Sequence, residues 1–92
     1  VEPGYYQEGA YGIRIENLVR VAACEQTDFA KDFLEFKILT LCPVDKQPVN
    51  KYLMSSGEIS WLNNYHKQVY ERLSPFLNAS EKNWLKDACS PL

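Results

Sequence analysis

The sequence predicts an α+β fold in which an antiparallel strand segment over residues 1–44 precedes a two-helix segment over residues 45–92. Two patterns predict this arrangement. In the first half, apolar residues alternate with charged ones, a period of two that is typical of strands with one polar face. In the second half, apolar residues recur at steps of three or four positions, as they do along one face of an amphipathic helix.

Two apolar runs in the first half of the chain predict strands. Residues 12–21 carry apolar side chains at every second or fourth position, which predicts one half-buried antiparallel strand; they are Ile13, Ile15, Val19 and Val21. Residues 33–44 form another β-rich run, and Pro43 limits its end. The polar residues 25–32 are expected to connect the two runs.

Capping sequences mark the starts of two helices in the second half. Ser55, with Glu58 three positions later, matches a capping box, and Asn78 with Glu81 is expected to cap a second, shorter helix. Pro75 is expected to end or bend the first helix. The apolar stripe of the first helix is expected to consist of Leu62, Tyr65, Val69, Leu73 and Phe76. The second helix carries Trp84, Leu85 and Ala88.

Composition and charge argue against several kinds of partner and site. The 92 residues carry 10 basic and 12 acidic side chains without a basic cluster, which argues against nucleic acid or an anionic membrane as the main partner. No apolar run approaches the length of a membrane span. The cysteines lack metal-site spacing, so reduced thiols in an intracellular protein are expected. His66, the one histidine, is expected to be a packing or surface residue.

The first sixteen residues place polar side chains on one face of a predicted hairpin. If the turn centres near Gly9, the numbers of antiparallel partners sum to about 18. Gly4 then lies opposite Arg14. Glu2 then lies opposite Glu16. Because side chains alternate between the faces of a strand, one face gathers Glu2, Tyr6, Arg14 and Glu16, while Ile13 and Ile15 lie on the other.

Two carboxylates that face each other across a strand pair have Cβ atoms about 5 Å apart and repel one another. A divalent cation such as manganese or magnesium between Glu2 and Glu16 would remove that repulsion, and Arg14 would offset the remaining negative charge. In the alternative interpretation, the two glutamates form an exposed cross-strand pair that Arg14 alone balances. The spacing leaves both interpretations open.

Two motifs carry a resemblance to a known family. They are Glu2-Pro-Gly-Tyr-Tyr6 and Gly12-Ile-Arg-Ile-Glu-Asn17, which resemble the last two metal-ligand motifs of the Xaa-Pro aminopeptidases, the aminopeptidase P enzymes of the pita-bread metallopeptidase superfamily. The run Leu39-Thr-Leu-Cys-Pro-Val-Asp45 resembles the final core strand of that family. Residues 61–66 and 84–85 resemble the C-terminal extension of its long, three-domain members.

The resemblance implies that residues 1–44 are the last strands of a pita-bread catalytic domain and that residues 45–92 are a helical C-terminal extension. Glu2 would be a terminal ligand of one of two metal ions, usually manganese, and would assist proton transfer, while Glu16 would bridge both ions. Tyr6 and Arg14 match positions that hydrogen-bond around this site. The implied reaction is hydrolysis of the first peptide bond in peptides whose second residue is proline.

The resemblance also sets expectations for partners. The remaining ligands of the family, two aspartates and a histidine, lie upstream of the glutamate that Glu2 matches. Because the chain begins with Val1 and shows no signal-type region, it is expected to be a piece of a longer, cytoplasmic enzyme. Because it carries only two of the five metal ligands, it is expected to be inactive alone. Its partners would be the rest of the polypeptide, an Xaa-Pro peptide and, through the extension, a second copy. The alternatives are a catalytically dead pita-bread homologue and a small protein-interaction module.

Overall fold

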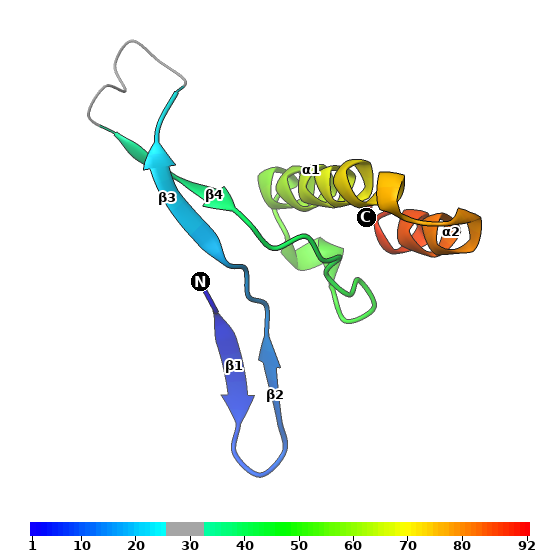
Figure 1. The fold of residues 1–92 in the computed structure, drawn as a ribbon. Coiled ribbons are helices and arrows are strands. Elements are labelled where there is room, and N and C mark those ends of the chain that lie inside the picture. The colour runs from blue at the N-terminus through cyan, green and yellow to red at the C-terminus, as the bar shows by residue number, and fades with distance from the viewer. Residues whose placement is uncertain (26–32) are drawn as a thin grey trace. The chain divides into compact units, whose positions relative to one another are not determined.

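The computed structural model describes residues 1–25 and 33–92, which form two compact units, Val1–Thr40 and Leu41–Leu92. The first unit contains the strands and the second contains the helices, which confirms the predicted α+β fold (Figure 1). The predicted connection over residues 25–32 lies, apart from its first residue, outside the described residues. The predicted domain boundary after residue 44 refers to a longer protein and stays a prediction.

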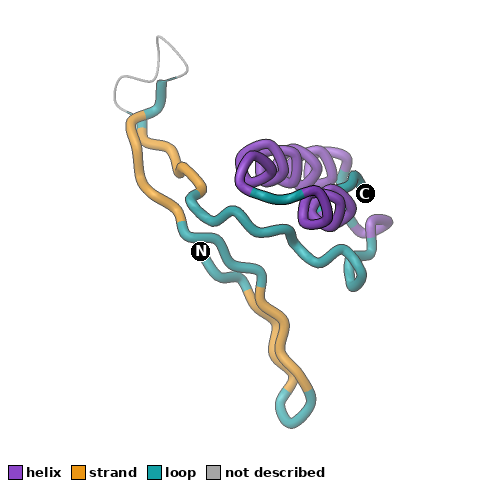
Figure 2. Tube along the Cα trace, turned by 45° about the vertical axis from the view of Figure 1, so that its right-hand side comes forward, coloured by secondary structure: helices purple, strands orange, loops and turns teal. Residues whose placement is uncertain are grey.

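The first unit consists of two separate antiparallel strand pairs. β1 (Gly4–Gln7) pairs with β2 (Tyr11–Arg14), and β3 (Val19–Ala23) pairs with β4 (Leu34–Ile38). Figure 2 shows each pair as two neighbouring orange segments. Each pair is thus a two-stranded ribbon, which needs further protein packed against it for stability.

The single strand predicted over residues 12–21 is wrong, because the structure interrupts it at residues 15–18. The chain changes partner inside this stretch. The Asn17 N–H donates to the carbonyl of Val1 at 3.0 Å, whereas the next carbonyl, that of Leu18, accepts from the Leu39 N–H at 2.8 Å. Asn17 and Leu18 therefore belong to different strand pairs. A local hydrophobic pattern does not show which strand each of them pairs with.

The expected half-buried face is wrong at three of its four positions: Ile13, Ile15 and Val21 are 50–55% exposed, and only Val19 is of intermediate burial. β1 and β2 are exposed on both faces. The β3–β4 pair has one face made entirely of apolar side chains, namely Val19, Val21, Ala23, Leu34, Phe36 and Ile38. On this face Leu34 is 70% exposed and Phe36 is 68% exposed. A contiguous apolar face of this kind is typical of a surface that other protein covers.

The first helix, α1 (Ser56–Leu73), begins at the predicted capping box. The Oγ of Ser55 accepts from the Glu58 N–H at 3.2 Å, and the Glu58 carboxylate accepts from the Ser55 N–H at 2.8 Å. These bonds satisfy backbone groups that the first turn of a helix leaves unpaired. The helix ends before Pro75, as expected, and a 3₁₀ turn over Ser74–Phe76 follows.

The second helix, α2 (Ala79–Ala88), begins with the same reciprocal exchange. The Asn78 side chain accepts from the Glu81 N–H, and the Glu81 carboxylate accepts from the Asn78 N–H, both at 2.9 Å. At the other end, the Lys46 Nζ donates to the carbonyl of Asp87 at 3.1 Å. A cation at this end is favourable because the helix dipole is negative there. No helix in the described part of the chain is long and apolar enough to cross a membrane.

Side chains from both helices form the buried core of the second unit, which consists of Leu62, Tyr65, His66, Val69, Leu85 and Cys89. The predicted stripe is therefore confirmed at its first three positions, and Leu73 is half-buried. Phe76 does not continue the stripe, because the turn that contains Pro75 takes it out of the helical repeat, and it is 85% exposed.

The strand expected to continue to Val44 ends at Ile38, and α1 explains the difference. The Cys42 N–H donates to the Tyr65 hydroxyl at 3.4 Å, and this hydroxyl donates to the Cys42 carbonyl at 3.0 Å. The Val44 N–H donates to the Nε2 of His66 at 3.0 Å. The side chains of Tyr65 and His66 thus bind backbone groups of Cys42 and Val44 that would pair with another strand if this segment were a strand.

His66 is a packing residue, in agreement with the prediction. Its side chain is fully buried, and the bond from Val44 requires a neutral ring with the proton on Nδ1. That nitrogen has no hydrogen-bond partner among the described residues. Burial, with a smaller contribution from the positive charge of Lys46, lowers the pKa of His66 below its ordinary value. Protonation of this ring therefore opposes folding.

This pKa direction predicts a pH-dependent stability of the helical unit. Since the unfolded chain binds the proton more readily, the stabilisation from the neutral ring is complete above the ordinary pKa of 6.5 and is lost as the pH falls below it. We expect urea unfolding of the 92-residue chain, followed by far-ultraviolet circular dichroism, to give a lower free energy of unfolding at about pH 5.5 than at about pH 7.5. The slope should be no more than about 1.4 kcal/mol per pH unit.

A His66→Gln variant is the control, because glutamine accepts a hydrogen bond and does not titrate. Its free energy of unfolding should change less between the two pH values than that of the unaltered chain. An equal change in both proteins would assign the pH dependence to other groups.

Candidate metal site

The candidate site lies on the β1–β2 hairpin, whose register confirms the prediction. The strands are joined by a turn at residues 8–10, in which Gly9 adopts a φ of +70°, a conformation that favours glycine. Gly4 lies opposite Arg14, and Tyr6 lies opposite Gly12, so the numbers of each pair sum to 18.

Backbone hydrogen bonds carry this register beyond the strands. The Ile15 N–H donates to the Pro3 carbonyl at 3.3 Å. Val1 and Asn17 exchange two bonds: the Asn17 N–H donates to the Val1 carbonyl at 3.0 Å, and the Val1 nitrogen donates to the Asn17 carbonyl at 3.2 Å. The residue numbers of the pairs Pro3–Ile15 and Val1–Asn17 also sum to 18, and both pairs occupy hydrogen-bonded positions of the ladder.

Glu2 and Glu16 lie between these two pairs and therefore face each other at a non-hydrogen-bonded position. At such positions the Cα atoms of the partners are about 4.5 Å apart, and the side chains approach each other most closely. Two like charges at this spacing repel. The backbone thus brings together two carboxylates that lie far apart in the sequence.

Arg14 lies on the same face and contacts one of the two carboxylates. Its Nε is 3.7 Å from the Oε1 of Glu16, and the two side chains are 55% and 52% exposed. An ion pair this exposed adds little stability on its own. Arg14 therefore reduces the negative charge of the pair without burying it, and oxygen atoms of Glu2 and Glu16 remain accessible.

The Tyr6 ring lies on this face above the backbone of Gly4 and Gly12. Sequence reasoning assigned no packing role to either glycine. The available signal was a tyrosine opposite a glycine in a hairpin, because an aromatic ring often covers a glycine across a strand pair. The predicted face, with Glu2, Tyr6, Arg14 and Glu16, thus has a bulky side chain at one end and the carboxylate pair at the other.

The donor atoms on this face fit part of a divalent cation site. Carboxylate oxygens suit hard or borderline cations such as manganese and magnesium, and a cation would offset the repulsion within the pair. Two carboxylates are an incomplete set, and residues 1–25 and 33–92 contain no group of three or more His, Cys, Asp or Glu side chains that could hold a metal ion. Further ligands would have to come from outside the described residues.

Comparisons with known proteins identify a family, relatives and a solved structure that are similar to this chain. The family described as the C-terminal region of peptidase_M24 matches residues 32–92. The chain is 42% identical over 96 residues to Protein pid-5 of Caenorhabditis elegans, covering 100% of the chain and 9% of that protein. It is also 42% identical over 96 residues to Xaa-Pro aminopeptidase app-1 of the same organism, covering 100% of the chain and 16% of that protein.

A solved structure that is similar along the entire chain supports the family assignment. It is the crystal structure of X-prolyl aminopeptidase from Caenorhabditis elegans, described as a cytosolic enzyme with a di-nuclear active site. The TM-score is 0.89 at 40% identity, and the match covers 100% of the chain and 16% of that protein. The chain thus spans only a small part of the relatives that it matches. Because the family match covers most of its length, the chain belongs to the peptidase M24 family, as its C-terminal region.

Proposed function

We propose that this chain is the C-terminal part of a dinuclear-metal aminopeptidase that removes the N-terminal residue from peptides with proline in second position. The observation that carries the proposal is the pairing of Glu2 with Glu16 at a non-hydrogen-bonded position of the hairpin. Similarity to a protein named as an Xaa-Pro aminopeptidase, and to a crystal structure described as di-nuclear, supports it.

In this proposal, Glu2 and Glu16 would hold manganese ions, with Glu2 as a ligand of one ion and Glu16 as a ligand shared by two. The bound ions would supply Lewis-acid polarisation of the scissile carbonyl. Arg14 orients the Glu16 carboxylate through its contact at 3.7 Å. Glu2 also assists proton transfer, and the Tyr6 hydroxyl hydrogen-bonds at the edge of the site. Each role falls on a residue of one exposed hairpin face.

The rest of the same polypeptide would complete the site and the fold. The apolar face of the β3–β4 pair supports this part of the proposal, since Leu34 and Phe36 are 70% and 68% exposed there. The remaining metal ligands would come from the protein that covers these strands. We also propose a cytoplasmic location, on the basis of the similarity to a protein described as cytosolic.

The chain by itself should not hydrolyse an Xaa-Pro peptide, even with added manganese. Two carboxylates without further ligands hold the ion weakly and do not assemble a pair of ions. The measurement is release of the first residue from such a peptide by the purified 92-residue chain, followed by chromatography. Turnover that increases with the concentration of the chain would contradict the expectation.

In the complete protein, Glu16→Gln should lower kcat by at least about 100-fold, since groups that only support a metal ligand are already worth about 10- to 100-fold. Manganese bound per protomer, measured by mass spectrometry after dialysis, should fall as well. Glu2→Gln should have the same two effects. The control is Glu8→Gln, which changes an acidic residue in the turn of the same hairpin.

Full activity and full metal content in either variant at the hairpin pair would overturn the assignment. A complete protein that neither binds manganese nor cleaves Xaa-Pro peptides would favour the catalytically dead homologue.

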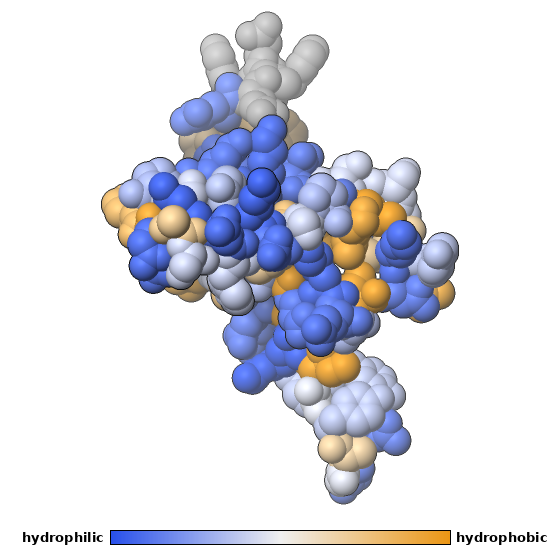
Figure 3. All heavy atoms as spheres, turned by 90° about the vertical axis from the view of Figure 1, so that its right-hand side faces the viewer, coloured by the Kyte–Doolittle hydropathy of each residue, from blue (hydrophilic) through white to orange (hydrophobic). Residues whose placement is uncertain are grey.

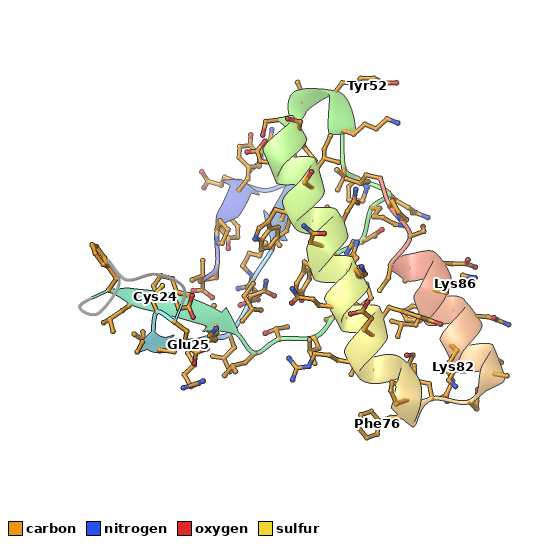
Figure 4. The ribbon with its side chains drawn as sticks, turned by 90° about the horizontal axis from the view of Figure 1, so that it is seen from above. Cys24, Glu25, Tyr52, Phe76, Lys82 and Lys86 are labelled. Atoms are coloured by element: carbon orange, nitrogen blue, oxygen red, sulfur yellow. The ribbon has the colours of Figure 1, made fainter. Side chains whose placement is uncertain are left out.

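We also propose that residues 45–92 contribute to a homodimer of the complete enzyme. Four of their aromatic side chains are largely exposed: Tyr52 (88%), Trp61 (53%), Phe76 (85%) and Trp84 (67%). Tyr52 and Phe76 project near opposite ends of α1 (Figure 4), and hydrophobic side chains appear as separate orange patches among polar ones in Figure 3. Aromatic residues are enriched in protein interfaces.

A groove in the helical unit adds to this surface. It has a volume of about 490 Å³ and is lined mostly by apolar side chains, which include Leu73, Leu77 and Trp84. In a two-fold dimer the same surface of each subunit contacts the other. Exposed rings of one copy could therefore pack into the apolar groove of the second copy, and the reverse.

Replacing Phe76 and Trp84 together by serine should weaken the dimer of the complete enzyme by at least about tenfold, because buried interface aromatics are often worth more than 1.4 kcal/mol. Sedimentation velocity over a range of concentrations measures this change. The matched control replaces Lys82 and Lys86, two exposed lysines of α2, by serine (Figure 4). A dimer that survives deletion of residues 45–92 would end this part of the proposal.

A further inference from the structure

The Tyr6 ring occupies space that two glycines leave open. A Cβ atom added at Gly12 would lie 2.7 Å from the Cδ1 of Tyr6 and 3.1 Å from its Cε1. A Cβ added at Gly4 would lie 2.8 Å from the tyrosine hydroxyl, 2.9 Å from Cε2 and 3.0 Å from Cζ. One edge of the ring therefore lies over Gly12, and its hydroxyl end lies over Gly4.

Neither Gly4 nor Gly12 can be replaced by a residue with a side chain while the Tyr6 ring keeps its present position. Carbon atoms in van der Waals contact are about 3.5–4.0 Å apart, so a methyl group at either position would force the ring to move. At Gly12 the clash is with Cδ1, an atom close to the backbone of Tyr6, which only a rotation of the whole ring relieves. Gly9 differs, because a Cβ there would meet nothing within 4 Å.

The position of the ring directs its hydroxyl toward the carboxylate pair. Gly4 lies between Tyr6 and Glu2 on the same face of the hairpin, and successive residues on one face of extended chain are about 7 Å apart. The hydroxyl above Gly4 is therefore about one such step from Glu2. At this separation a direct hydrogen bond or one bridging water can join it to the Glu2 carboxylate.

We propose that Gly4 and Gly12 are positioning residues that keep the Tyr6 ring flat on the hairpin, so that its hydroxyl is presented to Glu2 and Glu16. The conformational part of this inference concerns the hairpin alone. The catalytic part rests on the proposed function, because it assumes that the two carboxylates hold the metal ions.

The conformational part is tested by nuclear magnetic resonance of the complete protein with isotope-labelled glycine, in which the hairpin has its covering residues. Protons above an aromatic ring resonate upfield, so the Hα protons of Gly12 should be upfield of those of Gly9. Tyr6→Leu should remove the difference. Tyr5→Leu is the matched control, since Tyr5 lies on the opposite face and contacts Tyr11 at a ring separation of 6.1 Å. Gly12 protons without an upfield shift, or a shift that depends on Tyr5, would overturn the inference.

The catalytic part is tested in the complete enzyme. Gly12→Ala should lower kcat by about 10- to 100-fold, as loss of a group that supports a metal ligand does, and should leave KM nearly unchanged. Gly4→Ala should act in the same direction. Gly57→Ala is the control, because the added Cβ would meet only the Ser55 Oγ at 3.9 Å, and it should leave kcat unchanged.

A double-variant cycle separates positioning from general damage to the fold. If the glycine acts through the tyrosine hydroxyl, Gly12→Ala should lower kcat little further in an enzyme that already carries Tyr6→Phe. Losses that multiply in the double variant would overturn the positioning role while leaving the proposed function intact. Lack of Xaa-Pro hydrolysis by the unaltered enzyme, with the Gly12 shift present, would instead refute the proposed function and the catalytic part that rests on it.

Discussion

Two carboxylates that face each other at a non-hydrogen-bonded position of a hairpin repel one another, and a positive charge nearby offsets this repulsion. In the β1–β2 hairpin, the bonds between Val1 and Asn17 and from Ile15 to Pro3 fix Glu2 opposite Glu16. Arg14 supplies one positive charge at 3.7 Å from Glu16. A cation shared with ligands from other parts of a larger protein would offset the remaining repulsion, and the proposed chemistry is built on this arrangement.

The two units differ in how far they are stabilised by their own residues. The helical unit has its own core, two capping boxes and a fully buried His66 whose ring binds the backbone of the preceding segment. The strand unit consists of two ribbons, and one of them has an exposed apolar face. The described strands of this unit are held by backbone pairing, and most of their large apolar side chains are exposed. This contrast is what we expect if residues of a catalytic domain are joined to a self-contained extension.

The local features of the fold could be predicted from the sequence, whereas strand pairing and contacts between distant segments could not. The helix starts at Ser55 and Asn78 and the hairpin register around Gly9 depend on residues within a few positions of each other, and all three are confirmed. The break at residues 15–18 depends on which strand each half of the segment pairs with. The loss of strand structure before Val44 depends on side chains of α1 more than twenty residues away.

The candidate site follows the same division. The alternation rule and one assumed turn were enough to place Glu2 opposite Glu16, because a hairpin is local. The contact of the Tyr6 ring with Gly4 and Gly12 was not predicted, since it depends on the rotamer of one side chain. The metal roles of the glutamates depend on ligands beyond this chain, and for these the resemblance to the Xaa-Pro aminopeptidases was the only source.

Anomalous diffraction from manganese in crystals of the complete enzyme tests the central claim most directly. Our account predicts two anomalous peaks beside the hairpin, with carboxylate oxygens of Glu16 contacting both and an oxygen of Glu2 contacting one. Peaks that lie away from this face, or that neither glutamate contacts, would contradict it.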